Sequence, residues 1–199
     1  MYKHLKRAAD FCVALMMLII LSPLMLIAAL LIKSNCDGPV FFKQERPGLN
    51  GKIFTVYKFR TMYEGSEKGS QVTLDNDSRI TRSGKVLRKF RLDEFVQLFN
   101  ILKGEMSFVG TRPEVRRYVE KYSDEMYATL FLPAGVTSLA SIKFKDEEKL
   151  LSNSGNTDDT YVNEILPLKM QYNLEYVEKF NFFYDIKLMF MTVFAVVKK

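Results

Sequence analysis

Two adjacent acids, Asp93 and Glu94, stand in the part of the sequence that is richest in residues able to do chemistry. Arg112 follows them, and basic residues crowd the preceding stretch: Arg79, Arg82, Lys85, Arg88, Lys89 and Arg91. Acids that open a helix among cations are expected to have depressed pKa values and to stay ionised. Such a carboxylate can act as a nucleophile or bind Mg²⁺, and the cations can bind phosphate. An acid pair alone is more often a solvated helix start, so the prediction depends on its surroundings.

The rest of the composition narrows the available chemistry. The chain of 199 residues has one histidine, His4, and two cysteines, Cys12 and Cys36, which do not form a C-x-x-C pair. These counts argue against a disulfide framework, a thiolate metal site and histidine-based catalysis. The net charge of +6 favours anionic lipid or phosphorylated substrates. Nucleic acid would also fit the charge, but the basic residues are spread out and no zinc or helix-turn-helix signature accompanies them, so we expect no nucleic-acid partner.

The elements that must position the acid pair are mostly helical. Residues 93–102 predict a helix, because Phe95, Leu98, Phe99 and Leu102 recur at helical spacing and Gly104 can end it. Residues 40–42 and 53–59 predict a β-hairpin, and further helices are expected at 85–90, 114–123 and 161–180. Residues 182–197 predict an apolar helix, for which an interfacial amphipathic helix and a core helix are both open. The fold class is therefore mostly α with a small β-hairpin (α+β).

An apolar run at residues 11–32 is broken only by Ser22 and Pro23. A straight helix of that length reaches roughly 33 Å, so a transmembrane anchor is one interpretation. Pro23 must bend the helix, however, and we expect the Ser22 hydroxyl to bond back to the Leu18 carbonyl. Basic residues flank both ends, which favours a re-entrant membrane helix that enters and leaves by the cytoplasmic face. We therefore divide the chain into a helix-break-helix at 1–34 and a cytosolic catalytic domain at 35–199. No small-residue cleavage site follows the apolar run, which argues against a cleaved signal peptide.

Longer motifs surround the acid pair. The most specific of them are Asp77-x-Arg79-Ile80-Thr81, Leu92-Asp93-Glu94, Gln97-Leu98-x-Asn100-x-Leu102-x-Gly104 and Arg112-Pro113-Glu114, with Gln44-x-Arg46-x-Gly48 and Tyr57-Lys58-Phe59-Arg60-Thr61-Met62 upstream. With these motifs the sequence resembles the bacterial sugar transferase family, the monotopic phosphoglycosyl transferases that act on polyprenol phosphate. The likeness covers nearly the whole chain and matches the minimal catalytic type without extra membrane spans.

The resemblance implies a reaction in two steps. Asp93 attacks the β-phosphate of a UDP-sugar, UMP leaves, and polyprenol phosphate then takes the phosphosugar from the carboxylate. Lys58, Arg88 and Arg112 are the implied substrate ligands, although Lys58 could be a snorkelling interfacial lysine and Arg112 a structural ion pair. Mg²⁺ is the implied cofactor, with Asp93 and Glu94 as its ligands. Glu94 could instead assist the acceptor phosphate or serve only at the helix start.

The same resemblance implies partners and a location. The expected partners are a UDP-sugar, undecaprenyl phosphate and the phospholipid membrane, with a homodimer left open. The expected place is the cytoplasmic face of a bacterial inner membrane, where the product starts polysaccharide or glycoconjugate assembly.

Three departures from the family pattern keep a non-catalytic membrane scaffold as the alternative. Thr111 replaces a proline, Arg91 replaces a helix-capping Ser or Thr, and residues 133–148 differ most. We assign no binding role to residues 133–148.

Overall fold

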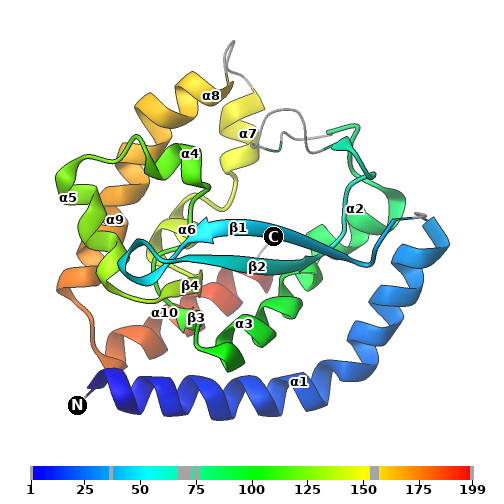
Figure 1. Cartoon of the computed structure of the whole chain (residues 1–199), viewed down its shortest axis with the longest axis horizontal. Helices are drawn as coiled ribbons and strands as arrows, with labels where there is room; N and C mark the ends of the chain where they lie inside the picture. The colour runs from blue at the N-terminus through cyan, green and yellow to red at the C-terminus, as the bar shows by residue number, and fades with distance from the viewer. Residues whose placement is uncertain (1, 36–37, 67–72, 74–76, 153–156, 198–199) are drawn as a thin grey trace.

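The computed structural model describes residues 2–35, 38–66, 73, 77–152 and 157–197, and it is mostly helical with two small sheets (Figure 1). The first half of the chain contains α1 (Tyr2–Asn35), β1 (Phe41–Pro47), η1 (Leu49–Gly51), β2 (Ile53–Phe59), α2 (Arg82–Lys89), η3 (Leu92–Gln97) and α3 (Leu98–Lys103). The second half contains β3 (Met106–Val109), α4 (Arg116–Val119), α5 (Asp124–Tyr127), η4 (Ala128–Phe131), β4 (Ala134–Thr137), α6 (Leu139–Lys143), α7 (Glu147–Ser152), α8 (Thr157–Thr160), η5 (Tyr161–Ile165), α9 (Leu166–Glu178) and α10 (Phe182–Val197). The predicted α+β class is confirmed.

The helix α1 runs along one side of the molecule and bends along its length (Figure 1), and Pro23 lies inside it. Its helical assignment continues through the bend, so the predicted break is a bend within one helix. Pro23 has no amide proton to give the Ile19 carbonyl, and the Ser22 hydroxyl donates to that oxygen instead, at 2.8 Å. The prediction that Ser22 bonds to Leu18 was wrong, because the carbonyl that loses its donor is the one four residues before the proline.

Both halves of α1 pack against the rest of the chain. Ala14 lies in a cluster with β2, α3 and β3 side chains, and Ala28 and Ile32 lie in another with Phe59 and Leu87. The opposite face is apolar but exposed, as at Ile19, which is 67% exposed, and Ile20, which is 65% exposed. The helix is long and apolar enough to cross a membrane. It therefore supplies one face to the protein core and leaves another uncovered.

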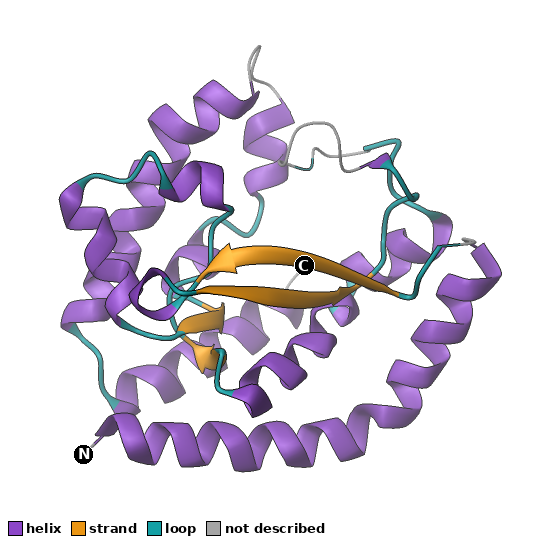
Figure 2. Ribbon diagram, in the orientation of Figure 1, coloured by secondary structure: helices purple, strands orange, loops and turns teal. Residues whose placement is uncertain are grey.

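The strands form two separate two-stranded sheets (Figure 2). The strands β1 and β2 form the predicted antiparallel hairpin, with Phe41 opposite Phe59 and Pro47 opposite Ile53. The strands β3 and β4 pair in parallel, which the sequence analysis missed. This pairing requires Gly110 and Gly135, since a Cβ on Gly135 would lie 2.2 Å from the Gly110 nitrogen.

Several helix predictions needed correction. The helix expected at 93–102 is a 3₁₀ turn, η3, followed by the short helix α3, and the helix expected at 114–123 is reduced to α4. The helix expected at 161–180 begins with a π-helical turn, η5, and Pro167 then lies in the first turn of α9. Ile165 and Leu166 keep helical dihedrals, so η5 runs into α9 without a break and Pro167 lies just after the π-helical turn rather than at a free helix start. The predicted helix at 182–197 is confirmed as α10.

A buried polar cluster joins the two ends of the described chain. Asp185 at the start of α10 accepts hydrogen bonds from Lys6 at 2.6 Å, from Tyr176 at 2.7 Å and from Tyr2. Leu188, one turn later, is fully buried with Tyr176 in a hydrophobic cluster. The outer face of α10 is apolar and exposed, with Phe183 82% and Phe194 69% exposed. The helix α10 is thus half core, half uncovered apolar surface.

Candidate active site

The acid pair is presented by a sharp change of direction between α2 and η3. Arg91 adopts a left-handed conformation with φ of 55°, and the 3₁₀ turn that contains Asp93 and Glu94 begins at the next residue. As expected from the departure at this position, Arg91 supplies no side-chain cap to η3. The acids therefore point in directions set by a tight turn rather than by a regular α-helix.

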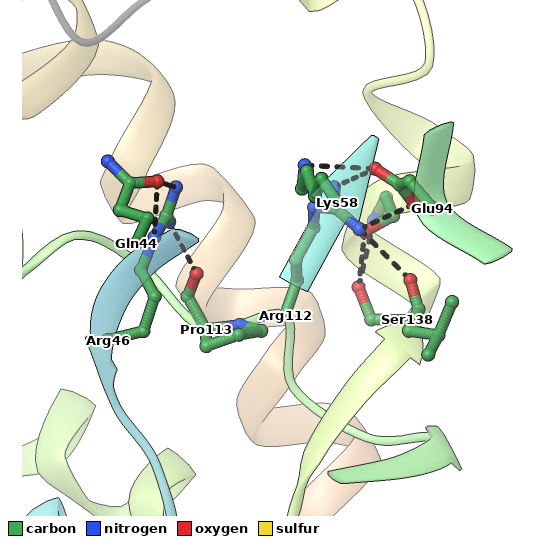
Figure 3. Close-up of polar contacts among 9 residues, drawn as sticks. Gln44, Arg46, Lys58, Glu94, Arg112, Pro113 and Ser138 are labelled. Atoms are coloured by element: carbon green, nitrogen blue, oxygen red, sulfur yellow. Dashed lines mark hydrogen bonds and ion pairs between the residues drawn. The ribbon is translucent and has the colours of Figure 1, made fainter. Parts of the chain in front are cut away.

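Glu94 is held between two cations that come from distant parts of the sequence (Figure 3). Lys58 Nζ on β2 lies 3.2 Å from Glu94 Oε1, and Arg112 forms two hydrogen bonds with the same carboxylate, one of them at 3.2 Å. Arg112 also donates to the Val136 carbonyl at 3.0 Å. Sequence analysis named all three charged residues, and the structure brings them together.

Asn100 and the glycine pair explain why these residues meet. The Asn100 side chain donates to the Thr55 carbonyl at 2.6 Å and accepts from the Tyr57 amide at 3.1 Å. These bonds fix α3 to the part of β2 that precedes Lys58. On the other side, the close approach of Gly110 and Gly135 sets the distance between Arg112 and the Val136 carbonyl.

Asp93 has a different environment from its neighbour. Its side chain is buried, and Oδ1 has no hydrogen-bond partner among the described residues. Burial raises the pKa of Asp93, and the adjacent Glu94 raises it further, against the opposing charges of Lys58, Arg88 and Arg91. The predicted depression of both pKa values was therefore wrong for Asp93, because the turn buries this carboxylate and its Oδ1 has no hydrogen-bond partner among the described residues.

The prediction holds for Glu94. Although burial opposes ionisation, Arg112 and Lys58 hold the pKa of Glu94 well below its usual range. Glu94 in turn raises the pKa of Arg112, while burial lowers the pKa of Lys58. The pair thus contains one firmly ionised acid that organises cations and one acid whose proton is held more tightly than usual.

Arg88 lies on α2 and is half-buried. Its charge lowers the pKa of Asp93, which places it within electrostatic reach of this carboxylate. Arg88 is therefore near the acid pair, as a substrate ligand would have to be.

The described residues contain no group of three or more His, Cys, Asp or Glu that could hold a metal alone. Mg²⁺ commonly binds to one or two carboxylates and takes its other ligands from water and substrate phosphates, so such a group is not required. Asp93 fits this role because its Oδ1 is unpartnered among the described residues. Glu94 fits less well, since both its oxygens already accept from Lys58 or Arg112.

Sequence analysis missed a second layer of charge behind Arg112. Arg46 donates to the Pro113 carbonyl at 2.6 Å, and Glu114 accepts from Lys169 at 3.0 Å. Lys169 also pairs with Glu147, at 3.0 Å, in the segment that departs most from the family pattern. Arg46 and Glu114 lie within the quoted motifs, which was the available signal, but Lys169 lies in a helix with no such signal.

Comparison with known proteins identifies the family of the chain. The profile of the bacterial sugar transferase family matches residues 1–199. The chain belongs to the bacterial sugar transferase family. The resemblance stated from the motifs is thereby confirmed.

Three relatives illustrate the range of the family. The chain is 37% identical over 96% of its length to a UDP-N-acetylgalactosamine-undecaprenyl-phosphate N-acetylgalactosaminephosphotransferase of Aeromonas hydrophila, covering 43% of that protein. It is 36% identical over 95% of its length to a UDP-glucose:undecaprenyl-phosphate glucose-1-phosphate transferase of Klebsiella pneumoniae, covering 39% of it. It is 35% identical to the uncharacterized sugar transferase EpsL of Bacillus subtilis, covering 85% of it. The chain thus spans about two-fifths of the first two relatives and most of the third.

Proposed function

We propose that this chain transfers a sugar 1-phosphate from a UDP-sugar to undecaprenyl phosphate through a covalent intermediate on Asp93. The observation that carries the proposal is the division of roles within the acid pair. Glu94 accepts the hydrogen bonds of Lys58 and Arg112, while Asp93 is buried beside it with Oδ1 unpartnered among the described residues. A carboxylate oxygen with no hydrogen-bond partner among the described residues is available for attack on phosphorus.

In the first step an Asp93 carboxylate oxygen attacks the β-phosphorus of the UDP-sugar. A bond forms between this oxygen and phosphorus, the bond from phosphorus to the bridging oxygen breaks, and UMP leaves with the bridging oxygen. In the second step a phosphate oxygen of undecaprenyl phosphate attacks the same phosphorus and the bond to Asp93 breaks. The product is undecaprenyl diphosphate-sugar, and the Asp93 carboxylate is restored.

The neighbouring residues stabilise charge rather than exchange protons. Arg112 stays protonated because Glu94 raises its pKa, so it offers a permanent positive charge to a diphosphate. Lys58 and Arg88 would add to this charge, and Glu94 keeps the cations aligned before substrate arrives. Mg²⁺, held by Asp93 with Glu94 as a weaker second ligand, would supply further neutralisation of the diphosphate.

We further propose that the protein is monotopic, at the cytoplasmic face of the bacterial inner membrane. Residues on both sides of Pro23 pack on the same globular domain, including Ala14 and Ile32, and this supports a helix that returns to the face it entered. The exposed apolar faces of α1 and α10 suit contact with lipid.

Cysteine labelling with a membrane-impermeant reagent tests this topology. The two variants are Lys3→Cys and Lys43→Cys, each in a background that also carries Cys12→Ser and Cys36→Ser. Labelling of both from the cytoplasmic side is expected; opposite sides would mean a span.

The covalent step is tested by intact mass. Purified protein is mixed with Mg²⁺ and UDP-N-acetylgalactosamine, UDP-glucose or UDP-galactose, without undecaprenyl phosphate. A mass increase of one sugar phosphate with equimolar UMP is expected, and both should be lost in Asp93→Asn. UMP release that occurs only after acceptor is added would indicate direct transfer instead. No turnover under either condition would favour the non-catalytic scaffold.

A further inference from the structure

The outer face of α2 carries basic side chains that the fold does not neutralise. Arg82, Lys85 and Lys89 are all exposed, and no residue of α2 is acidic. In the part of the chain that the structure describes, none of these three cations forms an ion pair. Exposed cations of a surface helix are often only solvated, so the charge by itself assigns no ligand.

Two apolar side chains on the exposed side distinguish α2 from a solvated helix. Val86 is 50% exposed, and Phe90, which follows the last residue of α2, is 55% exposed. The Lys89 ammonium lies 5.6 Å from the centre of the Phe90 ring. Cations beside exposed apolar side chains are typical of a helix at a bilayer surface, where the apolar groups enter the lipid and the cations meet headgroups.

The opposite face of α2 holds the helix in a fixed position on the domain. Thr81 caps the helix, because its hydroxyl oxygen accepts from the Gly84 amide at 2.9 Å. Gly84 lies against the backbone that follows β2, since a Cβ at this position would be 2.1 Å from the Thr61 carbonyl oxygen. The outer cations therefore have a defined place relative to the rest of the protein.

That place is beside the last turns of α1 (Figure 1). Leu87 of α2 packs in one hydrophobic cluster with Ala28 and Ile32 of α1. A helix rises about 14 Å from Pro23 to Ile32, and half of the hydrocarbon core of a bilayer is about 15 Å thick. With the bend of α1 deepest in the bilayer, α2 lies at the depth of the lipid headgroups. Lys33, exposed in the last turn of α1, lies at the same depth.

We propose that the outer face of α2, together with Lys33, binds the headgroups of anionic phospholipids; this rests on the proposed placement of α1 in the membrane. About four to eight Lys or Arg residues next to a membrane helix or on an amphipathic helix are typical of such a site. Anionic headgroups complement this face, whereas zwitterionic headgroups would leave its charge uncompensated.

The contact would also bear on the acid pair. The helix α2 leads through Phe90 and Arg91 directly into η3, which carries Asp93 and Glu94. Headgroups bound to α2 would therefore hold this turn close to the membrane surface, where a lipid acceptor arrives.

The test uses an introduced tryptophan, because the chain has none of its own. Phe90→Trp places the reporter at the end of α2, Ile20→Trp places it on the exposed face of α1, and Tyr127→Trp places it on α5. Each full-length variant is reconstituted into vesicles of equal parts phosphatidylcholine and phosphatidylglycerol. Bromine, which quenches tryptophan fluorescence, is carried on the acyl chains of one lipid or the other, so the vesicle charge stays constant.

A matched pair of charge variants is made in the Phe90→Trp background. Lys85→Gln/Lys89→Gln removes two cations from α2. Lys52→Gln/Lys121→Gln removes two exposed cations from other parts of the domain and serves as the control. The melting temperature of each variant checks that it is folded.

We expect brominated phosphatidylglycerol to quench Phe90→Trp more strongly than brominated phosphatidylcholine does. The relative association of phosphatidylglycerol should fall at least about fivefold in Lys85→Gln/Lys89→Gln and stay unchanged in Lys52→Gln/Lys121→Gln. High salt should weaken the preference, because it screens exposed charges. Ile20→Trp should be quenched by both lipids, and Tyr127→Trp by neither.

Equal quenching of Phe90→Trp by the two brominated lipids, or a preference that survives Lys85→Gln/Lys89→Gln, would overturn the inference. Quenching of Ile20→Trp without quenching of Phe90→Trp would also overturn it, since α2 would then lie away from the lipid. No quenching even of Ile20→Trp would contradict the proposed membrane placement itself. Because the measurement needs no turnover, its outcome is independent of whether the covalent step on Asp93 occurs.

Discussion

Lys6 Nζ lies 2.6 Å from Asp185 Oδ2, so a buried ion pair joins the N-terminal helix α1 to the C-terminal helix α10. Tyr176 bonds to the other carboxylate oxygen at 2.7 Å, so the acid is well partnered. Removing one member of such a pair leaves the other charge buried and uncompensated, which costs far more than the pair itself contributes.

We therefore expect Asp185→Asn to lower the free energy of unfolding by about 3 kcal/mol. The measurement is chemical denaturation in detergent. The control is Glu175→Gln, which removes the acid from the more exposed Lys179–Glu175 pair of α9, where a change of about 0–1 kcal/mol is expected. Equal effects for the two variants would mean that the Lys6–Asp185 pair is not buried in solution.

The two acids of the site should respond to neutralisation with opposite effects on stability. Glu94→Gln takes an ionised partner from Lys58 and Arg112 and should destabilise the protein by about 1–3 kcal/mol. Asp93→Asn removes a buried charge with an unpartnered oxygen and a repulsive neighbour, so stability should stay the same or rise. Both variants should lose adduct formation. Thermal unfolding compared side by side checks this, and a drop in Asp93→Asn would show that Asp93 has a structural partner.

Adduct formation should fall as pH falls through the pKa of Asp93. Because burial and Glu94 raise this pKa, the loss should begin at a higher pH than for an ordinary aspartate, whose pKa is about 4. Protonation removes the cost of the buried charge, so the contribution of Asp93 to stability rises as pH falls over the same window. Glu94 works in the opposite direction: because its pKa is held well below the usual range, its contribution to stability starts to be lost as pH falls past the ordinary glutamate pKa, about 4.3, and the loss is complete only below its own pKa. Activity should therefore disappear on acidification while circular dichroism still shows the folded protein. If activity and the folded signal are lost at the same pH, the loss of activity is caused by unfolding instead.

Gly135→Ala should prevent correct pairing of β3 with β4. The added Cβ would lie 2.2 Å from the Gly110 nitrogen, a backbone atom that cannot move away alone. We expect a loss of several kcal/mol in stability, or no folded protein, and the Arg112 contact to Val136 should be lost with it. Gly38→Ala is the control, because the nearest atoms to its Cβ would belong to side chains, those of Glu64 at 3.0 Å and of Arg60 at 3.6 Å. A Gly135→Ala protein with wild-type melting would contradict this account of the strand crossing.

Much of the fold could be predicted where a local pattern was strong. The hairpin followed from β-branched and aromatic runs around turn residues, and α10 followed from its apolar run. The parallel pair β3–β4 could not be predicted this way, because two strands of four residues give too few alternations and their pairing depends on contact between distant segments. The helix expected at 114–123 is reduced to Arg116–Val119, because Val115 before it is extended and gives it no side-chain cap.

The candidate site, like the fold, could be predicted only in part from the sequence. Lys58, Glu94 and Arg112 could be named because motifs mark them, but their meeting could not be predicted, since they come from β2, η3 and the segment after β3. The pKa of Asp93 was mispredicted because neighbouring charges are visible in a sequence while burial is not.

With α1 placed in the membrane as proposed, its packing makes lipid a ligand of the folded state. The face of α1 that carries Ala14 and Ile32 completes two hydrophobic clusters of the globular domain, while the opposite face is open. Anything that binds the folded chain better than the unfolded chain raises its melting temperature, by a stabilisation that grows with the logarithm of concentration relative to Kd. Partition into a bilayer and folding of the catalytic domain are then one coupled equilibrium. The melting temperature of this protein should accordingly be a property of the protein together with its membrane.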